Sequence, residues 1–318
     1  MKKRTTLLLL SAMVLLVMDS RCAANSAREA LYLCARTLIP SLFPLFVLSG
    51  MLVPGLAGIR IPGLSRLLGF PEGYFLLGSL GGYPLGAACI AQSVEQGDLS
   101  MKDADRMFGL CSLCGPGFLF GVVGTLLSVR EAALLFLFQL EAAILTAAFW
   151  PEVSTGTCRK EAEPVSFPAA LNRAVSSILS VCGWVIMAAV MAGFLRRWVF
   201  PFLPMGITVL LTGLLELTNG IFAAGSMPKD AQFVLCALFI SFGGVCVLLQ
   251  IGGLTTGSGI GQCIAQKAVH GILTAMLALL YLRFGLMTLL LIPALLFSKI
   301  AVEIPGRMVY NVRRKEGI

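Results

Sequence analysis

The sequence predicts an all-α polytopic membrane protein with two inverted repeats, each holding a re-entrant or broken helix, and about 8–10 membrane segments. Three observations lead to this fold class. The 318 residues are 58% hydrophobic and only 13% charged, against about 45–50% and about 25% in soluble domains. Long apolar runs are interrupted at matching places in the two halves of the chain. One long polar stretch separates those halves.

Most of the apolar runs approach the roughly 20 residues that cross a membrane core of about 30 Å. The expected segments cover 30–53, 107–127, 132–150, 171–195, 203–224, 233–254, 268–282 and 286–301, with a weaker one at 75–94. A shorter apolar run, 5–18, follows the basic residues 2–4 and could be a signal peptide. Asp19 and Arg21 form a poor cleavage region, so we expect a retained first span.

The polar stretch and similar motifs on either side of it define the predicted domain boundaries. The expected parts are an N-terminal membrane anchor helix (1–28), a first gate-like repeat (29–150), a polar linker (151–168), a second gate-like repeat (169–301) and a basic cytoplasmic tail (302–318).

The two interruptions, 78–88 and 213–225, carry glycine, proline and polar residues where lipid favours an unbroken helix. Lipid tolerates such backbone only where protein covers it or water reaches it. Paired interruptions in two halves indicate a substrate site between repeats. The sequence leaves open whether residues 70–95 span or re-enter. Two re-entrant hairpins place more Lys and Arg on the cytoplasmic side and also make the halves inverted.

The net charge of +8 is not a nucleic-acid signal, because the basic residues lie at expected membrane edges. Basic residues at both ends of the chain predict two cytoplasmic termini. The expected partners are the lipid bilayer and a small-molecule substrate, not nucleic acid, and a homo-oligomer is left open.

The sequence contains no catalytic motif, and we expect neither an enzyme nor a cofactor or metal site. The pair Cys111-x-x-Cys114 could bind metal or do redox chemistry, but no second pair or histidine follows at zinc spacing. Cysteine inside apolar spans acts as a small hydrophobe, so packing is the favoured interpretation.

The predicted substrate site lies at the two interruptions. Glu216 is followed by Thr218 and Asn219, which places a carboxylate, a hydroxyl and an amide beside a backbone that can unwind. Such a cluster could bind a coupling proton or cation, or accept hydrogen bonds from a substrate; a protonated glutamate bonded to a neighbouring helix is the structural alternative. Tyr83 is the matching candidate in the first half, and Gln250 is a further binding candidate in the second. The residues expected to shape the backbone are Gly82, Pro84, Gly86, Gly115 and Gly220.

Two further residues are candidates for an ion or proton relay. Glu141 lies within an apolar segment, and a structural hydrogen bond is the alternative. His270, the only histidine, stands near the start of a predicted span and three residues after Lys267. Its ordinary pKa near 6.5 suits a relay, although a lone histidine at an interface is more often structural.

Several motifs in order resemble the YlbJ-type sporulation integral membrane proteins, which contain the gate, or nucleoside-recognition, domain. They are Ser41-Leu-Phe-Pro-Leu-Phe-Val-Leu-Ser-Gly50, Gly81-Gly-Tyr-Pro-Leu-Gly-Ala87, Gly115-Pro-Gly-Phe118, Leu215-Glu-Leu-Thr-Asn-Gly220 and Ser241-Phe-Gly-Gly244.

The resemblance implies a multi-pass protein of the bacterial cell membrane that moves a small organic anion, dipicolinate, during sporulation. The wider family makes a nucleoside-type carrier the alternative cargo class. A non-transporting membrane scaffold for spore envelope assembly is the alternative from another functional class.

Overall fold

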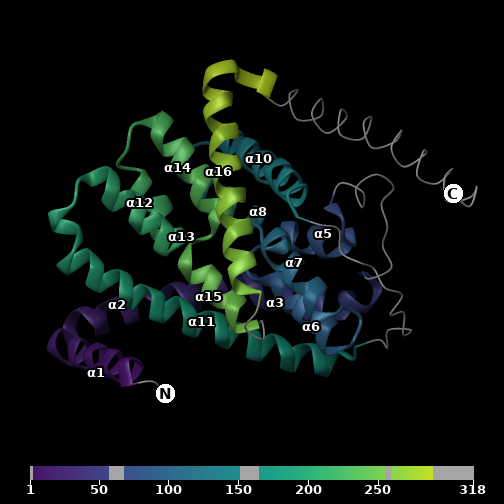
Figure 1. Ribbon diagram of the computed structural model, residues 1–318, viewed down its shortest axis with the longest axis horizontal. Helices are drawn as coiled ribbons and strands as arrows, with labels where there is room; N and C mark the ends of the chain where they lie inside the picture. The colour runs from purple at the N-terminus through teal and green to yellow at the C-terminus, as the bar shows by residue number, and fades with distance from the viewer. Residues whose placement is uncertain (1–2, 57–67, 151–164, 255–258, 289–318) are drawn as a thin grey trace, which may run out of the picture.

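A computed structural model describes residues 3–56, 68–150, 165–254 and 259–288 of the chain. Every regular element in these ranges is helical (Figure 1). The fold class predicted from the sequence is therefore confirmed at the level of an all-helical protein. The greater part of the predicted linker, most of the last expected span (286–301) and the basic tail lie outside the described residues.

The first half begins with four helical elements, from α1 to α3, and continues through short, interrupted helices. Its elements are α1 (Lys3–Met18), α2 (Ser20–Leu33), η1 (Cys34–Leu38), α3 (Ile39–Leu56), α5 (Glu72–Gly81), α6 (Leu85–Glu95), α7 (Met101–Cys111), α8 (Pro116–Phe118), η2 (Leu119–Val123), α9 (Gly124–Leu126) and α10 (Val129–Ala147). The expected boundary after residue 28 falls inside α2.

The second half opens with the longest helix and ends with the second longest. Its elements are α11 (Phe167–Trp198), η3 (Phe200–Phe202), α12 (Met205–Leu215), α13 (Leu217–Ala224), α14 (Lys229–Phe242), α15 (Gly244–Leu254), α16 (Ile260–Phe284) and η4 (Gly285–Met287). In Figure 1, α16 runs through the middle of the molecule and α11 lies along one side of it.

Five helical stretches of the described chain are long and apolar enough to cross a membrane: Ser20–Val53, Met101–Leu126, Phe167–Trp198, Lys229–Leu254 and Ile260–Met287. The segments around Gly78 and Gly213 are not among them. Their arms α5, α6, α12 and α13 have only 8 to 11 residues, or roughly 12–17 Å at 1.5 Å per residue. Each arm is therefore too short to cross the membrane core alone.

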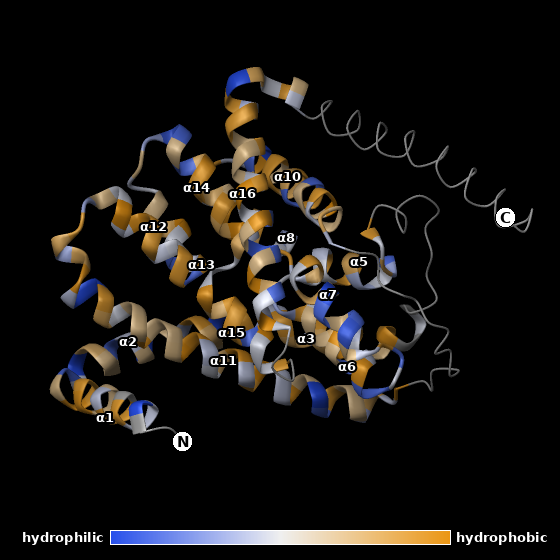
Figure 2. Ribbon diagram, in the orientation of Figure 1, coloured by the Kyte–Doolittle hydropathy of each residue, from blue (hydrophilic) through white to orange (hydrophobic). Residues whose placement is uncertain are grey.

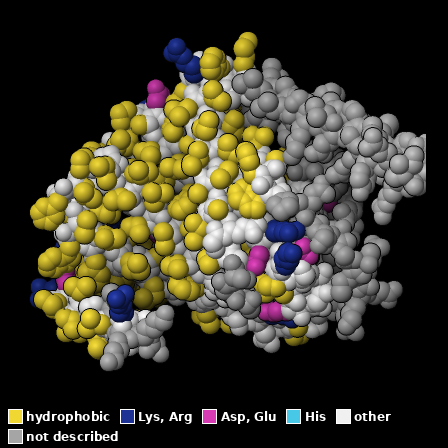
Figure 3. Space-filling view, in the orientation of Figure 1, with side chains coloured by type: hydrophobic (Ala, Val, Ile, Leu, Met, Phe, Trp, Pro, Cys, Tyr) yellow, Lys and Arg dark blue, Asp and Glu magenta, His cyan; other side chains and the backbone are white. Residues whose placement is uncertain are grey.

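Apolar side chains also cover the outside of the molecule. Figure 2 shows hydrophobic residues around most helices, and Figure 3 shows them over the face formed by α12, α13 and α14. Charged side chains on that view gather beside α6 and α7 and near helix ends. Leu179, Met187, Phe222 and Leu279 are large apolar residues exposed on three different helices. Lipid would cover such a surface, as expected for a membrane protein.

The helix interruptions have local causes. In the stretch Ser20–Val53, Pro40 lacks the amide hydrogen that would bond one turn back. The wider helical turn η1 ends at Leu38, two residues before this proline. Between α5 and α6, Gly82 takes a φ of +79° and the Tyr83–Pro84 peptide bond is cis. Between α14 and α15, Gly243 and Gly244 both have a φ of +82°. Glycine is the residue that enters this region at little cost.

Each hairpin closes through a pair of glycines, one on each arm. Gly78 and Gly86 face each other, and a Cβ on either would overlap the carbonyl oxygen of Cys111 in α7. Gly213 and Gly220 pair in the same way in the second half, where the ring of Phe239 in α14 covers both. These close approaches hold each hairpin against the helix that follows it, α7 in the first half and α14 in the second.

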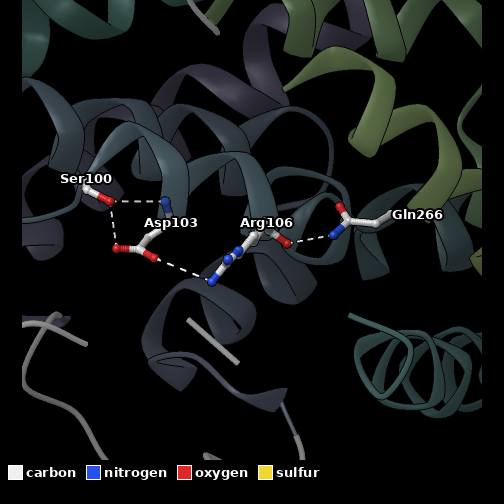
Figure 4. A network of polar contacts seen from close by, with 4 residues as sticks. All are labelled: Ser100, Asp103, Arg106 and Gln266. Carbon is white, nitrogen blue, oxygen red and sulfur yellow. Dashed lines mark hydrogen bonds and ion pairs between the residues drawn. The ribbon is translucent and has the colours of Figure 1, made fainter. Parts of the chain in front are cut away.

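Helix α16 packs closely along α7. Ser100 caps α7 by accepting a hydrogen bond from the amide of Asp103, and it donates to that carboxylate at 2.7 Å. From α16, the Gln266 side chain donates to the carbonyl of Arg106 at 2.7 Å, as Figure 4 shows. A Cβ on Gly109 would overlap the Gln266 side chain, so the helices are in direct contact here.

The predicted start of the last described span, residue 268, was wrong by about two turns. Helix α16 begins at Ile260 because Gln266 and Lys267 are not interfacial residues. Both are fully buried against α7, and average hydropathy cannot distinguish a buried polar face from an exposed helix end.

Candidate functional site

A cavity of about 330 Å³ lies between the two helix hairpins. It lies among α3, α11, α15 and both interruptions. Six of the residues predicted for the substrate site line it: Gly82, Tyr83, Gly115, Glu216, Thr218 and Gln250. The structure therefore brings together candidates that are as much as 168 positions apart in the chain. Whether they bind a substrate stays a prediction.

Glu216 forms the second interruption by capping the helix after it. Its backbone is extended, at φ −147° and ψ 124°, and its carboxylate accepts hydrogen bonds from the amides of Thr218 and Asn219 at 2.9 and 2.8 Å. A carboxylate at a helix N-terminus is stabilised by the helix dipole and by these bonds. The carboxylate therefore caps α13, whereas the structural alternative expected from the sequence was a bond to a neighbouring helix, and Glu216 also lies in the cavity wall.

Tyr83 forms the tip of the first hairpin and joins the two halves. Its hydroxyl donates to the carbonyl of Ile240 at 2.8 Å and lies 3.2 Å from that of Ser241, both in the last turn of α14. The same oxygen accepts a hydrogen bond from the Lys267 ammonium at 2.8 Å. Tyr83 lines the cavity and Lys267 does not, so Tyr83 connects the cavity wall to Lys267.

The interruption after α7 is supported by two long side chains. Gln139 of α10 donates to the carbonyl of Cys114 at 2.7 Å and accepts from its amide at 3.2 Å. Lys267 of α16 donates to the carbonyl of Ser112 at 2.7 Å. Buried backbone groups need partners of this kind, and here they come from the two helices that end the two halves.

Lys267 and His270 form the polar centre of the molecule. Lys267 is 0% exposed and His270 is 1% exposed. His270 Nε2 lies 2.8 Å from the carbonyl of Gln139, so it donates, and Nδ1 is left as an acceptor 3.4 Å from Lys267 Nζ. Among the described residues, the ammonium therefore contacts three acceptors and lies 4.8 Å from the centre of the Tyr83 ring, and none of these groups is a carboxylate.

Four predicted site residues stand beside the cavity rather than in its wall. Pro84 precedes α6, and Gly86 packs beneath Cys111 of α7. Asn219 contributes its backbone amide to Glu216, and Gly220 packs against Gly213. Their observed roles are in backbone geometry, as expected for Pro84, Gly86 and Gly220, whereas Asn219 was expected to contact substrate.

The two relay candidates lie in different surroundings. His270 belongs to the buried network around Lys267, not to a membrane interface. Glu141 is on α10, is only half-buried, and has one carboxylate oxygen without a hydrogen-bond partner. Residues two apart on a helix point in different directions. Gln139 therefore reaches the network and Glu141 does not.

Lys267 and Gln139 belong to the site but were not predicted to do so from the sequence. One signal was available, because Lys267 and His270 are three residues apart and share a helix face. The packing of Gln139 against the interruption after α7 depends on the tertiary fold, so its glutamine side chain alone gave no sign.

The cysteines of the Cys111-x-x-Cys114 pair are free thiols buried in the core. Within the described ranges, no group of three or more His, Cys, Asp and Glu residues could hold a metal ion. The surroundings of these two cysteines fit the packing interpretation.

A second cavity, of about 350 Å³, lies further along the same helices. Its wall is more polar and includes Ser49, Gln92, Glu95, Asn172, Arg173, Ser176 and Ser177. On each helix that contributes to both cavities, buried apolar residues lie at or between the two linings. They include Phe46 of α3, Ile178 of α11 and Ile251 of α15. These residues form one apolar layer between the two cavities.

Comparisons with known proteins do not assign the chain to a family. No protein-family model, curated protein or solved structure matches the chain. The resemblance to the YlbJ-type proteins stays a prediction from the sequence motifs.

Proposed function

We propose that this chain is an integral membrane carrier of a small organic metabolite, which binds in the cavity between the two hairpins. The observation that carries the proposal is that both interruptions line one cavity. Small-molecule sites are concave, mostly apolar and furnished with a few polar groups, at volumes of about 300–1,000 Å³. This cavity has that character, with Glu216, Thr218 and Gln250 as its polar groups.

The order of elements supports two repeats. In each half a long helix is followed by a hairpin, an interrupted helix and a closing helix: α3, α5–α6, α7–α9 and α10, then α11, α12–α13, α14–α15 and α16. In each half the hairpin tip also lies on the next interruption, Gly82 against Gly115 and Glu216 against Gly244. We propose that these halves are inverted repeats and that the short hairpin arms re-enter the membrane.

The second cavity supports a route through the protein. It continues from the first along α3, α11, α15 and the first hairpin, with one apolar layer between. In the proposed carrier this layer is the closed gate, and the cavity beside Glu95 and Arg173 is the vestibule on one side of the membrane. Alternating access would open the layer by moving one repeat against the other.

The cargo follows from the resemblance and from the charges. The resemblance implies dipicolinate, carried in the cell membrane of a sporulating bacterium with both termini in the cytoplasm. The carboxylate of Glu216 in the cavity wall repels a dianion and accepts hydrogen bonds from hydroxyl groups. That observation favours a nucleoside as the second candidate cargo.

The test is uptake of labelled dipicolinate and labelled uridine by proteoliposomes that hold the purified protein. Gly117 lines the cavity, and no atom lies within 4 Å of a Cβ added there. Gly117→Leu therefore fills open space in the cavity. Gly183 of α11 is the matched control, because it is also exposed and open but does not line the cavity.

We expect wild type and Gly183→Leu to take up one of the two compounds and Gly117→Leu to lose at least tenfold in rate. Equal uptake by Gly117→Leu would remove the cavity from the mechanism. No uptake of either compound by wild type, under imposed proton and sodium gradients, would favour the scaffold alternative.

A further inference from the structure

The ammonium of Lys267 lies where the C-terminal ends of two interrupted helices converge. Helix α7 ends at Cys111, and the next carbonyl, of Ser112, accepts from Lys267 at 2.7 Å. Helix α14 ends at Phe242, and its last-turn carbonyls at Ile240 and Ser241 contact the Tyr83 hydroxyl. That hydroxyl accepts from Lys267 at 2.8 Å. The Lys267 ammonium therefore contacts the end of α7 directly and is linked to the end of α14 through the Tyr83 hydroxyl.

Such a place attracts cations for a general reason. A helix C-terminus carries about half a negative charge, from carbonyls without helical partners. In carriers built from broken helices, unwound carbonyls and half-helix C-terminal ends coordinate the coupling cation. Here the interruption after α7 supplies a direct carbonyl ligand, from Ser112, and Tyr83 links Lys267 to the end of α14.

The hydrogen-bond directions indicate a charged lysine. Tyr83 uses its hydrogen toward the α14 carbonyls, and His270 uses its Nε2 hydrogen toward Gln139, so both offer acceptors to Lys267. With the Ser112 carbonyl, three acceptors face the three hydrogens of an ammonium group. Burying an unpaired ammonium is costly, and these acceptors with the two helix ends offset that cost.

We propose that Lys267 is a tethered cation that occupies the position of a coupling ion, so the protein works without bound sodium. The coupling part of this inference rests on the proposed carrier function. The site itself does not, because a monovalent cation of about ammonium size should bind wherever the side chain is removed and the acceptors remain.

The experiment measures thermal unfolding of the purified full chain in detergent, which requires no transported substrate. Lys267→Ala removes the ammonium and leaves Tyr83, Ser112 and His270 in place. Gln266→Ala is the matched control, since Gln266 is also fully buried and donates at 2.7 Å to a carbonyl of α7. Each protein is heated in ammonium, sodium or choline chloride at equal ionic strength.

We expect Lys267→Ala to have a lowered midpoint in choline chloride that ammonium, and to a smaller extent sodium, raises by several degrees. Gln266→Ala and wild type should not distinguish the salts. A Lys267→Ala midpoint that is equal in all three salts, or the same salt response in both variants, would overturn the proposal.

If Lys267→Ala cannot be purified, the response of the wild-type protein to sodium still tests the proposal. Stabilisation of wild type by sodium over choline, or uptake that requires a sodium gradient, would show a vacant sodium site and refute the tethered cation. Because unfolding is measured without substrate, the tethered-cation proposal can fail while the carrier function stands. The carrier function can likewise fail while the tethered-cation proposal stands.

Discussion

Replacing Glu216 by glutamine should weaken the second hairpin by an amount that the structure allows us to estimate. The carboxylate accepts two amide hydrogen bonds, at 2.9 and 2.8 Å. Glutamine keeps one acceptor oxygen, so one amide at the start of α13 loses its partner. A hydrogen bond to a charged group contributes about 1.5–3 kcal/mol, and a charge at a helix N-terminus about 0.3–1 kcal/mol. Replacing a good N-cap typically costs about 0.5–2 kcal/mol.

The amide oxygen that remains recovers part of this loss, so we expect Glu216→Gln to lower the free energy of unfolding by about 1–2 kcal/mol. Thermal unfolding in detergent measures the change, with an expected fall of a few degrees in midpoint. Protein levels should stay intact, and uptake by proteoliposomes should be lost.

Glu216→Asp separates the two roles of the carboxylate. Aspartate is a strong N-cap, so this variant should unfold at the wild-type temperature while its shorter side chain withdraws from the cavity. Reduced uptake by a stable Glu216→Asp protein would assign the carboxylate to the cargo or ion. An unchanged midpoint for Glu216→Gln would refute the capping argument, and normal uptake would remove Glu216 from the mechanism.

Two further predictions concern packing and the N-terminal helices. Gly86→Ala places a Cβ on the carbonyl of Cys111, so we expect the free energy of unfolding to fall by about 1–3 kcal/mol. Gly121→Ala is the control and should leave stability unchanged, because no atom lies within 4 Å of a Cβ added there. Asp19 caps α2 and pairs with Arg197 at 2.9 Å; Asp19→Asn keeps a cap and should cost under about 1 kcal/mol, whereas Asp19→Ala should cost about 1–2 kcal/mol. Equal thermal unfolding midpoints for Gly86→Ala and Gly121→Ala would contradict the close packing of Gly86 on Cys111. Equal midpoints for Asp19→Asn and Asp19→Ala would contradict the capping role of Asp19.

The breaks could be predicted from the sequence because their causes are local. Gly82 with Pro84, and Gly243 with Gly244, carry conformational signals in the residues themselves. Hydropathy likewise indicated an all-helical membrane protein. The same signals placed five of the six predicted cavity residues, all except Gln250, at interruptions, since a chain that repeats its order of elements can bring matching interruptions together.

The polar network could not be predicted, because it depends on which helices face each other. Gln139 and Lys267 lie 25 and 155 positions from the carbonyls they bond, and no local pattern gives such pairings. The role of Glu216 as a cap was missed for another reason. A carboxylate after an apolar run suggests ion binding, and only the observed break at that residue shows that the next helix begins there.

The network also limits how the two halves could move. Tyr83, Ser112 and Gln139 belong to the first half, whereas Lys267 and His270 belong to the second, so the contacts of Lys267 with Tyr83 and Ser112 cross between halves. Leaving a buried polar group without a partner costs about 1–3 kcal/mol. In the proposed carrier, separating the halves at this point would break several such bonds at once. Motion that keeps this centre intact and opens the apolar layer at Phe46, Ile178 and Ile251 costs less, because these apolar side chains have no polar atoms to leave without partners.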